Sequence, residues 1–447
     1  MRKKLIAMIM VVTMILTMMS GCSSSDKTSD TSETGTPTQA ANADNGSDTE
    51  TDEKITLSLF WWGNQTRNDV TKKAIDLYMQ QNPNIEINPE FTDWSGYWDK
   101  LATMTAGGNM PDIIQQDYSL ISSYQKSGQL ADLTSFIEDG TIDNTNIPES
   151  IIKSGSIDGK VYAISLGSNA PMMIYDKELV EKAGVTIPEQ PTITELYNIS
   201  EQIYAATGAK ARIHDSALNM MQMIARANGS HIFDELKAGD ATSVIKTFNN
   251  VTRFHESEAT ISQDLLAEKN IDLLENKPIV DQTTWNEFSL SNLFISISEV
   301  AGRELGACMY PIADDAKQQP MYLKPSMFFS IAETSEHKKE AAEFIDWFTN
   351  SVECNEILLG ERGIPISTVV AEAIKPMVGE TSAKVFDYIN MVSEIAEPID
   401  APDPAGKAEV DADLTAFVED VIYGDKTAEE ASKIFTEKAQ KILKEAE

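Results

Sequence analysis

The stretch from Asp158 to Leu179, DGKVYAISLGSNAPMMIYDKEL, indicates the fold more clearly than any other part of the chain. It opens with an Asp-Gly tight-turn dipeptide, and the β-rich run that follows is interrupted by Gly167, Asn169 and Pro171 before apolar residues resume. A helix is expected after Asp176, which can act as its N-cap. Two strands joined by a short irregular crossing are typical of a chain that leaves one sheet and enters another.

Length and charge limit the classes of protein that the chain can belong to. Its 447 residues are enough for two domains, because single hydrophobic cores stop growing near about 250 to 300 residues. The chain carries 70 acidic and 36 basic residues, a formal charge of -34. Such a surface repels nucleic acid and anionic headgroups, so we expect neither as a partner of the folded body.

Strands alternate with helices in the first part of the body. Alternating apolar residues start at Ile55, a helical face with Val70 and Tyr78 follows, and further strands are expected near Ile85 and Ile113. This order predicts a parallel or mixed sheet with helices on its faces. Residues 192–276 are expected to be mainly helical, and their methionines are interpreted as core filler.

The opening stretch also resembles a known family. Its pattern GKxYxIxxGxN, followed by IYDKELVEKAG, resembles the first crossing between lobes in the extracellular sugar-binding proteins of ABC importers, the maltose-binding-like group. Further motifs of that group recur in order from about Ile55 to about Pro365. They are Trp61-Trp62-Gly63, Gly107 to Ile114, Gly306 to Pro311 and Glu361 to Pro365. The segment QPTITEL departs from the pattern because it lacks the usual Trp.

The resemblance implies an α/β, two-lobe periplasmic-binding-protein-like fold of type II, with a mixed sheet flanked by helices in each lobe and a hinge between them. It places lobe 1 at 54–166 plus 310–350 and lobe 2 at 167–309 plus 351–447. It also implies a protein that binds a carbohydrate, specifically an oligosaccharide, and delivers it to two ABC permease subunits and an ATPase. We expect the folded body to be a monomer. A hinge of this kind closes around its ligand.

The amino-terminal segment is expected to direct export. Residues 1–21 combine a positive start with an apolar run that is short for a membrane span. Their last residues, Met19-Ser20-Gly21, together with the following Cys22, resemble a lipobox. This implies a diacylglycerol on Cys22 and a lipid-anchored protein at the extracellular face of the membrane. An ordinary cleaved signal with an incidental cysteine is the alternative. Residues 22–53 are expected to form a disordered tether.

Signatures of catalysis are missing from the sequence. The four histidines form no HExxH motif, and no Gly-x-Ser-x-Gly elbow occurs. No cysteine pair has zinc-type spacing, and Cys308 and Cys354 are interpreted as buried thiols, with a disulfide between them as the alternative. The sequence therefore predicts a protein that is not an enzyme and that has no cofactor, and it gives no candidate metal-ligating residues.

Aromatic residues beside polar ones near the expected strand ends suggest where a sugar could bind. Ligands of open α/β sheets bind beyond the carboxyl ends of strands, and a sugar offers C–H faces to rings and hydroxyls to polar groups. The candidate ligand-binding residues are Trp62, Trp94, Tyr97, Asp117, Tyr118, Asn169, Trp285 and Arg362.

Several of these residues have a structural alternative. Strand alternation turns one of Trp61 and Trp62 into the core, Asp117 can serve only as a helix cap, Asn169 can serve only the hinge turn, and Arg362 can pair with a lobe carboxylate. Two other functions also remain open. They are a lipoprotein that binds a non-sugar solute such as a peptide or an opine, and a secreted glycosidase.

Overall fold

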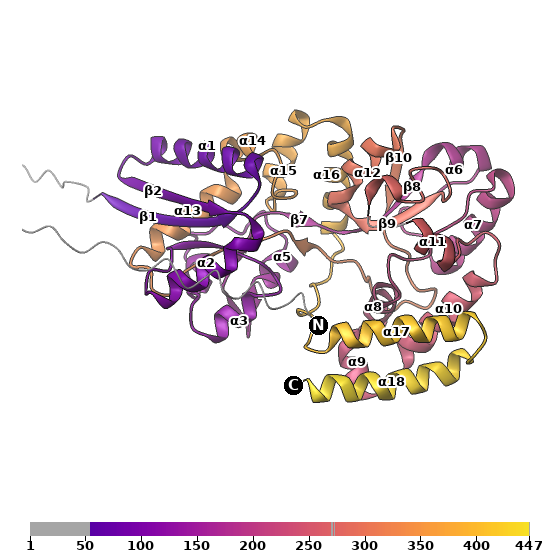
Figure 1. Ribbon diagram of the computed structural model, residues 1–447. Helices are drawn as coiled ribbons and strands as arrows, with labels where there is room; N and C mark the ends of the chain where they lie inside the picture. The colour runs from indigo at the N-terminus through magenta and orange to yellow at the C-terminus, as the bar shows by residue number, and fades with distance from the viewer. Residues whose placement is uncertain (1–53, 270, 272, 447) are drawn as a thin grey trace, which may run out of the picture. The chain divides into compact units, whose positions relative to one another are not determined.

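The computed structural model describes residues 54–446 except 270 and 272 (Figure 1). The expected signal segment, Cys22 and the tether up to residue 53 lie outside the described residues. All described residues fall within one compact unit. In this part of the chain, no helix is both long and apolar enough to cross a membrane.

A five-stranded sheet organises the first lobe, in the order β2-β1-β3-β12-β6. Its strands are β1 (Ile55–Trp62), β2 (Ile85–Thr92), β3 (Ile113–Gln116), β6 (Ile164–Ser165) and β12 (Phe328–Ile331). β1 pairs in parallel with β2 and β3, whereas β12 runs antiparallel to β3 and β6. Leu59 and Phe60 of β1 point to opposite faces of the sheet and are both fully buried, because both faces are covered. The expected mixed sheet is confirmed.

Helices cover both faces of this sheet. Figure 1 shows α1 (Gln65–Gln81) on one side of β1 and β2 and α2 (Trp94–Ala106) on the other. Each begins at a side-chain cap, with Asn64 accepting from the Arg67 amide and Asp93 accepting from the Gly96 amide, both at 2.9 Å. The other helices before the first crossing are α3 (Ile121–Lys126), α4 (Thr134–Glu138) and α5 (Glu149–Ser154).

The Asp-Gly dipeptide forms the tight turn that the sequence predicts. It joins β4 (Ser156–Ile157) to β5 (Lys160–Val161) in an antiparallel pair. Asp158 and Gly159 have φ angles of 51° and 78°. Two successive left-handed residues match the right-handed twist of a hairpin.

The second lobe contains a three-stranded sheet, in the order β10-β8-β9. β8 (Pro171–Asp176) lies at its centre and pairs antiparallel with β9 (Asn286–Leu290) and β10 (Leu305–Cys308). Asp176 ends β8 and accepts from the Leu179 amide at 3.2 Å, which starts α6 (Lys177–Ala183). α6 ends at Gly184, whose φ of 69° suits glycine.

Helices supply most of the second lobe. They are α7 (Ile193–Thr207), α8 (Ala217–Ala227), α9 (Ile232–Ala238), α10 (Thr242–His255), α11 (Gln263–Lys269), η1 (Leu274–Asn276), η2 (Ser291–Leu293), α12 (Phe294–Ala301), α16 (Glu380–Ser393), α17 (Lys407–Ile422) and α18 (Ala428–Glu445). A capping box formed by Thr427 and Glu430 starts α18, as the sequence predicts. Met220, Met221 and Met223 of α8 are buried, which confirms their role in the core.

The crossings between the lobes pack closely. β7 (Ser168–Asn169) pairs antiparallel with β11 (Lys324–Pro325), and Ser168 also bridges to Ile364. A Cβ on Gly167 would lie 2.3 Å from the Arg362 carbonyl oxygen, so only glycine fits this position.

Two segments pack on the lobe opposite to the one that the sequence suggests. Residues before β11 contact the second lobe, where the Lys317 amide donates to the Ala227 carbonyl at 2.7 Å. Beyond α13 (Lys338–Asn350), α14 (Val352–Leu358) packs on α1, and Arg67 pairs with Glu361 at 2.9 Å. α15 (Thr368–Ile374) and η3 (Lys375–Met377) follow, and α16 then packs on α12 in the second lobe.

Cys308 and Cys354 are buried free thiols, as expected.

Candidate ligand-binding site

A cavity of about 480 Å³ lies where the crossings meet both lobes, and we call it the cleft cavity. The first lobe contributes residues that directly follow β3, and the second lobe contributes the end of β9 and one side of α8. Its walls are Asp117, Tyr118, Ser119, Pro171, Asp215, Asn219, Gln222, Met223, Ser289, Leu290, Tyr310, Tyr322, Lys324, Pro325, Ser326 and residues 399–403. Ligand pockets commonly lie at such strand ends and between domains.

Asp117 and Tyr118 are the two sequence-predicted residues that line the cleft cavity. The Asp117 carboxylate accepts from the Ser119 amide at 2.9 Å, so it also shapes the turn before α3. The Tyr118 hydroxyl donates to the Asp400 carbonyl of the second lobe. Burial, with the nearby Asp400 carboxylate, raises the pKa of Tyr118, so its phenol stays neutral and can donate a hydrogen bond.

Asn169 lies beside the cleft cavity without lining it. It pairs through β7 with Lys324 of β11, and Lys324 is a lining residue. Asn169 takes part in the crossing through its backbone pairing with Lys324. This agrees with the alternative that Asn169 serves the hinge turn and does not bind the ligand.

The structure gathers Trp62, Trp94 and Tyr97 elsewhere, around the carboxyl end of β1. Trp62 contacts Trp94 and Tyr97 with ring centroids 4.9 Å and 5.0 Å apart. Tyr97 is fully buried, and its hydroxyl donates to the Gln115 carbonyl at 2.7 Å. Trp94 is 50% exposed, yet none of the three rings lines the cleft cavity.

Trp285 and Arg362 are not brought to the cleft cavity either. Trp285, just before β9, is fully buried. Arg362 is 2% exposed and its guanidinium lies 3.4 Å from both the Gln115 amide oxygen and the Glu361 carboxylate. Burial lowers the pKa of Arg362 to about 9, and the neighbouring Arg67 adds to this shift. In this structure Arg362 ties the crossing segment to β3.

Sequence reasoning missed most of the lining residues. Tyr310 and Tyr322 follow β10 in an apolar context that resembles core, and burial raises the pKa of Tyr322 to about 12, so it is a neutral donor. Lys324 supplies an ammonium group, whereas Asp215, Asp400 and Asp403 add carboxylates. The available signal was the Gly306–Pro311 crossing motif, which contains Tyr310.

Asp400 is the most highly connected of these residues. Its carboxylate accepts from Gln222 at 2.8 Å, contacts the His231 Nδ1 at 2.7 Å and pairs with Arg226. Arg226 is almost fully buried, so this pair fixes residues 399–403 against α8.

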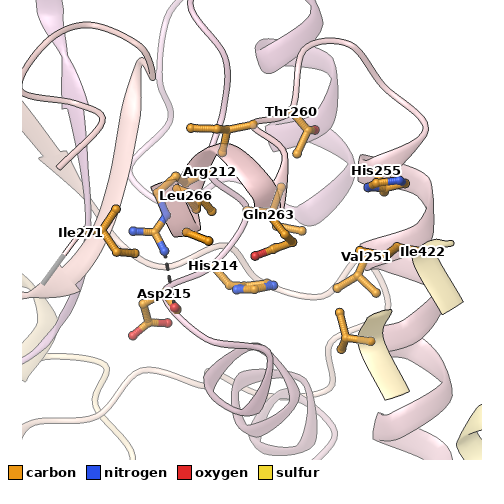
Figure 2. A pocket seen from close by; sticks show the side chains of 14 residues that line it. Arg212, His214, Asp215, Val251, His255, Thr260, Gln263, Leu266, Ile271 and Ile422 are labelled. Atoms are coloured by element: carbon orange, nitrogen blue, oxygen red, sulfur yellow. Dashed lines mark hydrogen bonds between the residues drawn. The ribbon is translucent and has the colours of Figure 1, made fainter. Parts of the chain in front are cut away.

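A second cavity, of about 270 Å³, lies entirely within the second lobe and we call it the helical cavity (Figure 2). Arg212 in its wall pairs with the buried Glu287 at 2.6 Å and donates to the Asp215 carbonyl at 3.4 Å. Burial lowers the pKa of His214 to about 4, which keeps the ring neutral. Of these two cavities, the cleft cavity is the one lined by residues of both lobes, and it is therefore the better candidate for the ligand site.

Comparison with known proteins agrees with this geometry. Residues 73–383 match the family model described as bacterial extracellular solute-binding protein. A family 1 extracellular solute-binding protein from Alicyclobacillus acidocaldarius superposes with a TM-score of 0.78 and 28% identity over 88% of this chain and 99% of that one. An oligogalacturonide-binding protein from Yersinia enterocolitica has the same fold, with a TM-score of 0.72, 21% identity and coverage of 88% and 100%.

Two sequence relatives share shorter segments. The diacetylchitobiose-binding protein DasA of Streptomyces coelicolor is 33% identical over 28% of this chain and 28% of its own. The arabinooligosaccharide-binding protein of Bacillus subtilis is 24% identical over 39% of this chain and 41% of its own. The match thus spans less than half of either relative.

The fold is a two-lobe α/β body with a cavity lined by residues of both lobes. The chain belongs to the bacterial extracellular solute-binding protein family. No group of three or more histidine, cysteine or carboxylate side chains that could hold a metal ion occurs among the described residues.

Proposed function

We propose that the chain is the substrate-binding component of an ABC importer and that it captures a carbohydrate, specifically an oligosaccharide. The observation that carries this proposal is the lining of the cleft cavity. It combines the rings of Tyr118, Tyr310 and Tyr322 with carboxylate, amide and hydroxyl groups from both lobes. Rings bury the C–H faces of a sugar while polar groups satisfy its hydroxyls. The names of the relatives DasA and the arabinooligosaccharide-binding protein support the same ligand class.

Closure of the two lobes about the crossings is the proposed mechanism. Strands β7 and β11 and the segment around Ile364 connect the lobes, and we place the return to the second lobe after η3 rather than after Asn350. A ligand that contacts both lobes stabilises the closed state by its extra contacts there. Small-angle scattering should show compaction at saturating sugar. An unchanged radius of gyration would argue against closure.

A glycan panel tests the ligand class. A sugar that binds only the folded state raises the unfolding temperature by mass action, with about 2.7 kcal/mol of stabilisation at a concentration of 100 times Kd. We expect a shift with at least one neutral oligosaccharide and confirmation by calorimetric titration. Peptides and opines belong in the same panel, because a shift with these alone would favour the non-sugar solute.

The proposal also holds that the protein is not an enzyme. Incubating purified protein with a fluorescently labelled oligosaccharide should leave the label on the intact chain. Release of shorter labelled products by the purified protein would instead support the glycosidase alternative.

Anchoring and partners complete the proposal. A diacylglycerol on Cys22 would hold the monomer at the extracellular face of the membrane, and the tether up to residue 53 would let it reach two permease subunits and their ATPase. Mass spectrometry of the protein from its native membrane should find the lipid on Cys22. An unmodified Cys22, or cleavage well beyond it, would contradict the anchor.

A further inference from the structure

The helical cavity contains a group of side chains that sugar binding in the cleft cavity does not use. Its volume is about 270 Å³, and the residues that line it belong to the second lobe. α10 contributes Val251 and His255, α11 contributes Gln263 and Leu266, and α17 contributes Ile422 (Figure 2). His255 and Gln263 are exposed, so the cavity opens to solvent beside α10 and α11.

Part of the wall of the helical cavity is apolar. The aliphatic side chains that line it are Val251, Ile261, Leu266, Val418 and Ile422. Apolar side chains that face an empty space lose dispersion contacts on that side, so a ligand that fills the space restores them. An apolar cavity of about 150 Å³ takes up benzene. The helical cavity therefore has room for a six-membered ring with a small substituent.

The rest of the wall contains buried polar atoms that lack a partner. Among the described residues, no hydrogen bond reaches Arg212 Nε, either ring nitrogen of His214 or the Thr260 hydroxyl. All three residues line the helical cavity (Figure 2). A buried polar atom without a partner is costly, and folded proteins pair nearly all such atoms with protein, water or ligand. A ligand with a hydrogen-bonding group would therefore be favoured at this wall.

The charges around the helical cavity favour a neutral ligand. Arg212 is already paired with the buried Glu287 at 2.6 Å, and burial lowers the pKa of His214 to about 4, so that this ring is neutral near pH 7. An anion would thus meet no unpaired arginine or lysine among the described lining residues. A cation would meet only the Asp215 carboxylate, which is exposed and accepts from the Asn219 side chain at 2.6 Å. Burial of a charge without such compensation is costly.

We propose that the helical cavity is a second ligand site, separate from the cleft cavity, and that it takes a small, mostly apolar, neutral molecule of about the size of phenol that carries one hydroxyl group. The apolar ring fills the aliphatic part of the cavity, and the hydroxyl bonds to a ring nitrogen of His214. Because these nitrogens are buried, the bond requires a small rotation of the imidazole. A neutral imidazole has one donor and one acceptor, and a hydroxyl can likewise donate and accept.

Binding of phenol tests the site, with benzoate and benzylammonium as charged probes of similar size. Calorimetric titration of the full-length protein should show saturable binding of phenol and at least about tenfold weaker binding of both charged probes. Leu266→Trp fills the cavity from α11 and should weaken phenol binding by about tenfold or more. Leu265→Trp is the matched control, because Leu265 is also half-buried on α11 and does not line the cavity.

The role of His214 has its own test. His214→Phe keeps a ring of similar size but removes both nitrogens, so it should weaken binding of phenol and leave binding of toluene as it is in wild type. Equal affinity of wild type and His214→Phe for phenol would overturn the assigned hydrogen bond. Unfolding temperatures close to wild type confirm that each variant is folded.

A crystal soaked with 4-iodophenol locates the ligand without any substitution. The anomalous signal of iodine should lie inside the helical cavity. Iodine at other positions alone, no binding of phenol in solution, equal losses in Leu266→Trp and Leu265→Trp, or tighter binding of a charged probe would each overturn the proposal. None of these results depends on sugar binding, so the proposed function stands or falls separately.

Discussion

At the scale of single residues, binding measurements on variants can identify which aromatic ring stacks on the ligand. Tyr322 and Tyr118 line the cleft cavity, whereas Trp94 is exposed and lies in the aromatic group around β1. We expect Tyr322→Ala to weaken sugar binding by about 2 kcal/mol, typical of an aromatic anchor, because it removes a ring from the cavity wall.

Trp94→Ala is the matched comparison for that variant. Calorimetric titration of both against the same sugar should show a large loss for Tyr322→Ala and little change for Trp94→Ala. The reverse order would move the site toward the carboxyl end of β1, where the sequence alone suggests it.

His214 provides a prediction about pH. Its pKa is lowered to about 4 in the folded protein because its ring nitrogens are buried, against about 6.5 for an exposed histidine. The unfolded chain therefore binds the proton first as the pH falls, so this contribution to stability is complete above pH ~6.5 and is lost progressively toward pH ~4. The free energy of unfolding should fall by up to about 3 kcal/mol over that window because of this one group.

Urea unfolding at several pH values measures this effect. His214→Asn should flatten the pH dependence, because it removes the group that takes up the proton on unfolding. Identical slopes for wild type and His214→Asn would show that the ring does not titrate in this way.

At the scale of elements, Gly167 controls the approach of the two crossing segments. A Cβ there would lie 2.3 Å from the Arg362 carbonyl oxygen, and backbone cannot move away as easily as a flexible side chain. We expect Gly167→Ala to separate β7 from the segment at Ile364 and to destabilise the protein by about 2 kcal/mol or more.

Gly107→Ala is the control for this substitution. Its φ is -79°, and a Cβ there would meet its nearest atoms at an ordinary 3.5 Å. Chemical denaturation should show a loss for Gly167→Ala that Gly107→Ala lacks. Equal stability of the two variants would mean that the crossing is more adaptable than its packing indicates.

At the scale of the whole molecule, charge should restrict the ligand. The chain carries a formal charge of -34, and the cleft cavity presents Asp117, Asp215, Asp400 and Asp403 against Lys324, with Asp400 already paired to Arg226. Uncompensated like charges in a partly enclosed site repel an anion. We therefore expect a neutral oligosaccharide to bind at least about tenfold more tightly than a uronate oligosaccharide of the same length.

Titrations at low and high salt measure this discrimination. The gap between the neutral and the uronate ligand should narrow as salt screens the carboxylates. Tighter binding of the uronate would contradict this prediction. The ligand preference would then resemble that of the Yersinia structural relative, which is named as an oligogalacturonide-binding protein.

Local signals in the sequence were sufficient for the elements and the fold class. The turn at Asp158, the cap at Asp176 and the capping box at Thr427 depend on residues within a few positions of one another, and all three form as predicted. Alternating strands and helices, together with the ordered family motifs, were enough to predict two lobes and the mixed sheet of the first lobe. The mixed sheet expected in the second lobe was wrong, because β8 pairs antiparallel with both β9 and β10.

Tertiary structure alone decided which side chains meet at the site and where some segments pack. Trp285 is near a strand end as predicted, but its carbonyl accepts from the Asp176 amide and its ring is fully buried. Tyr322 lines the cleft cavity together with Asp400, a residue 78 positions away in the printed sequence. The direction in which a ring points depends on register and on contacts with distant segments, and no local pattern contains that information.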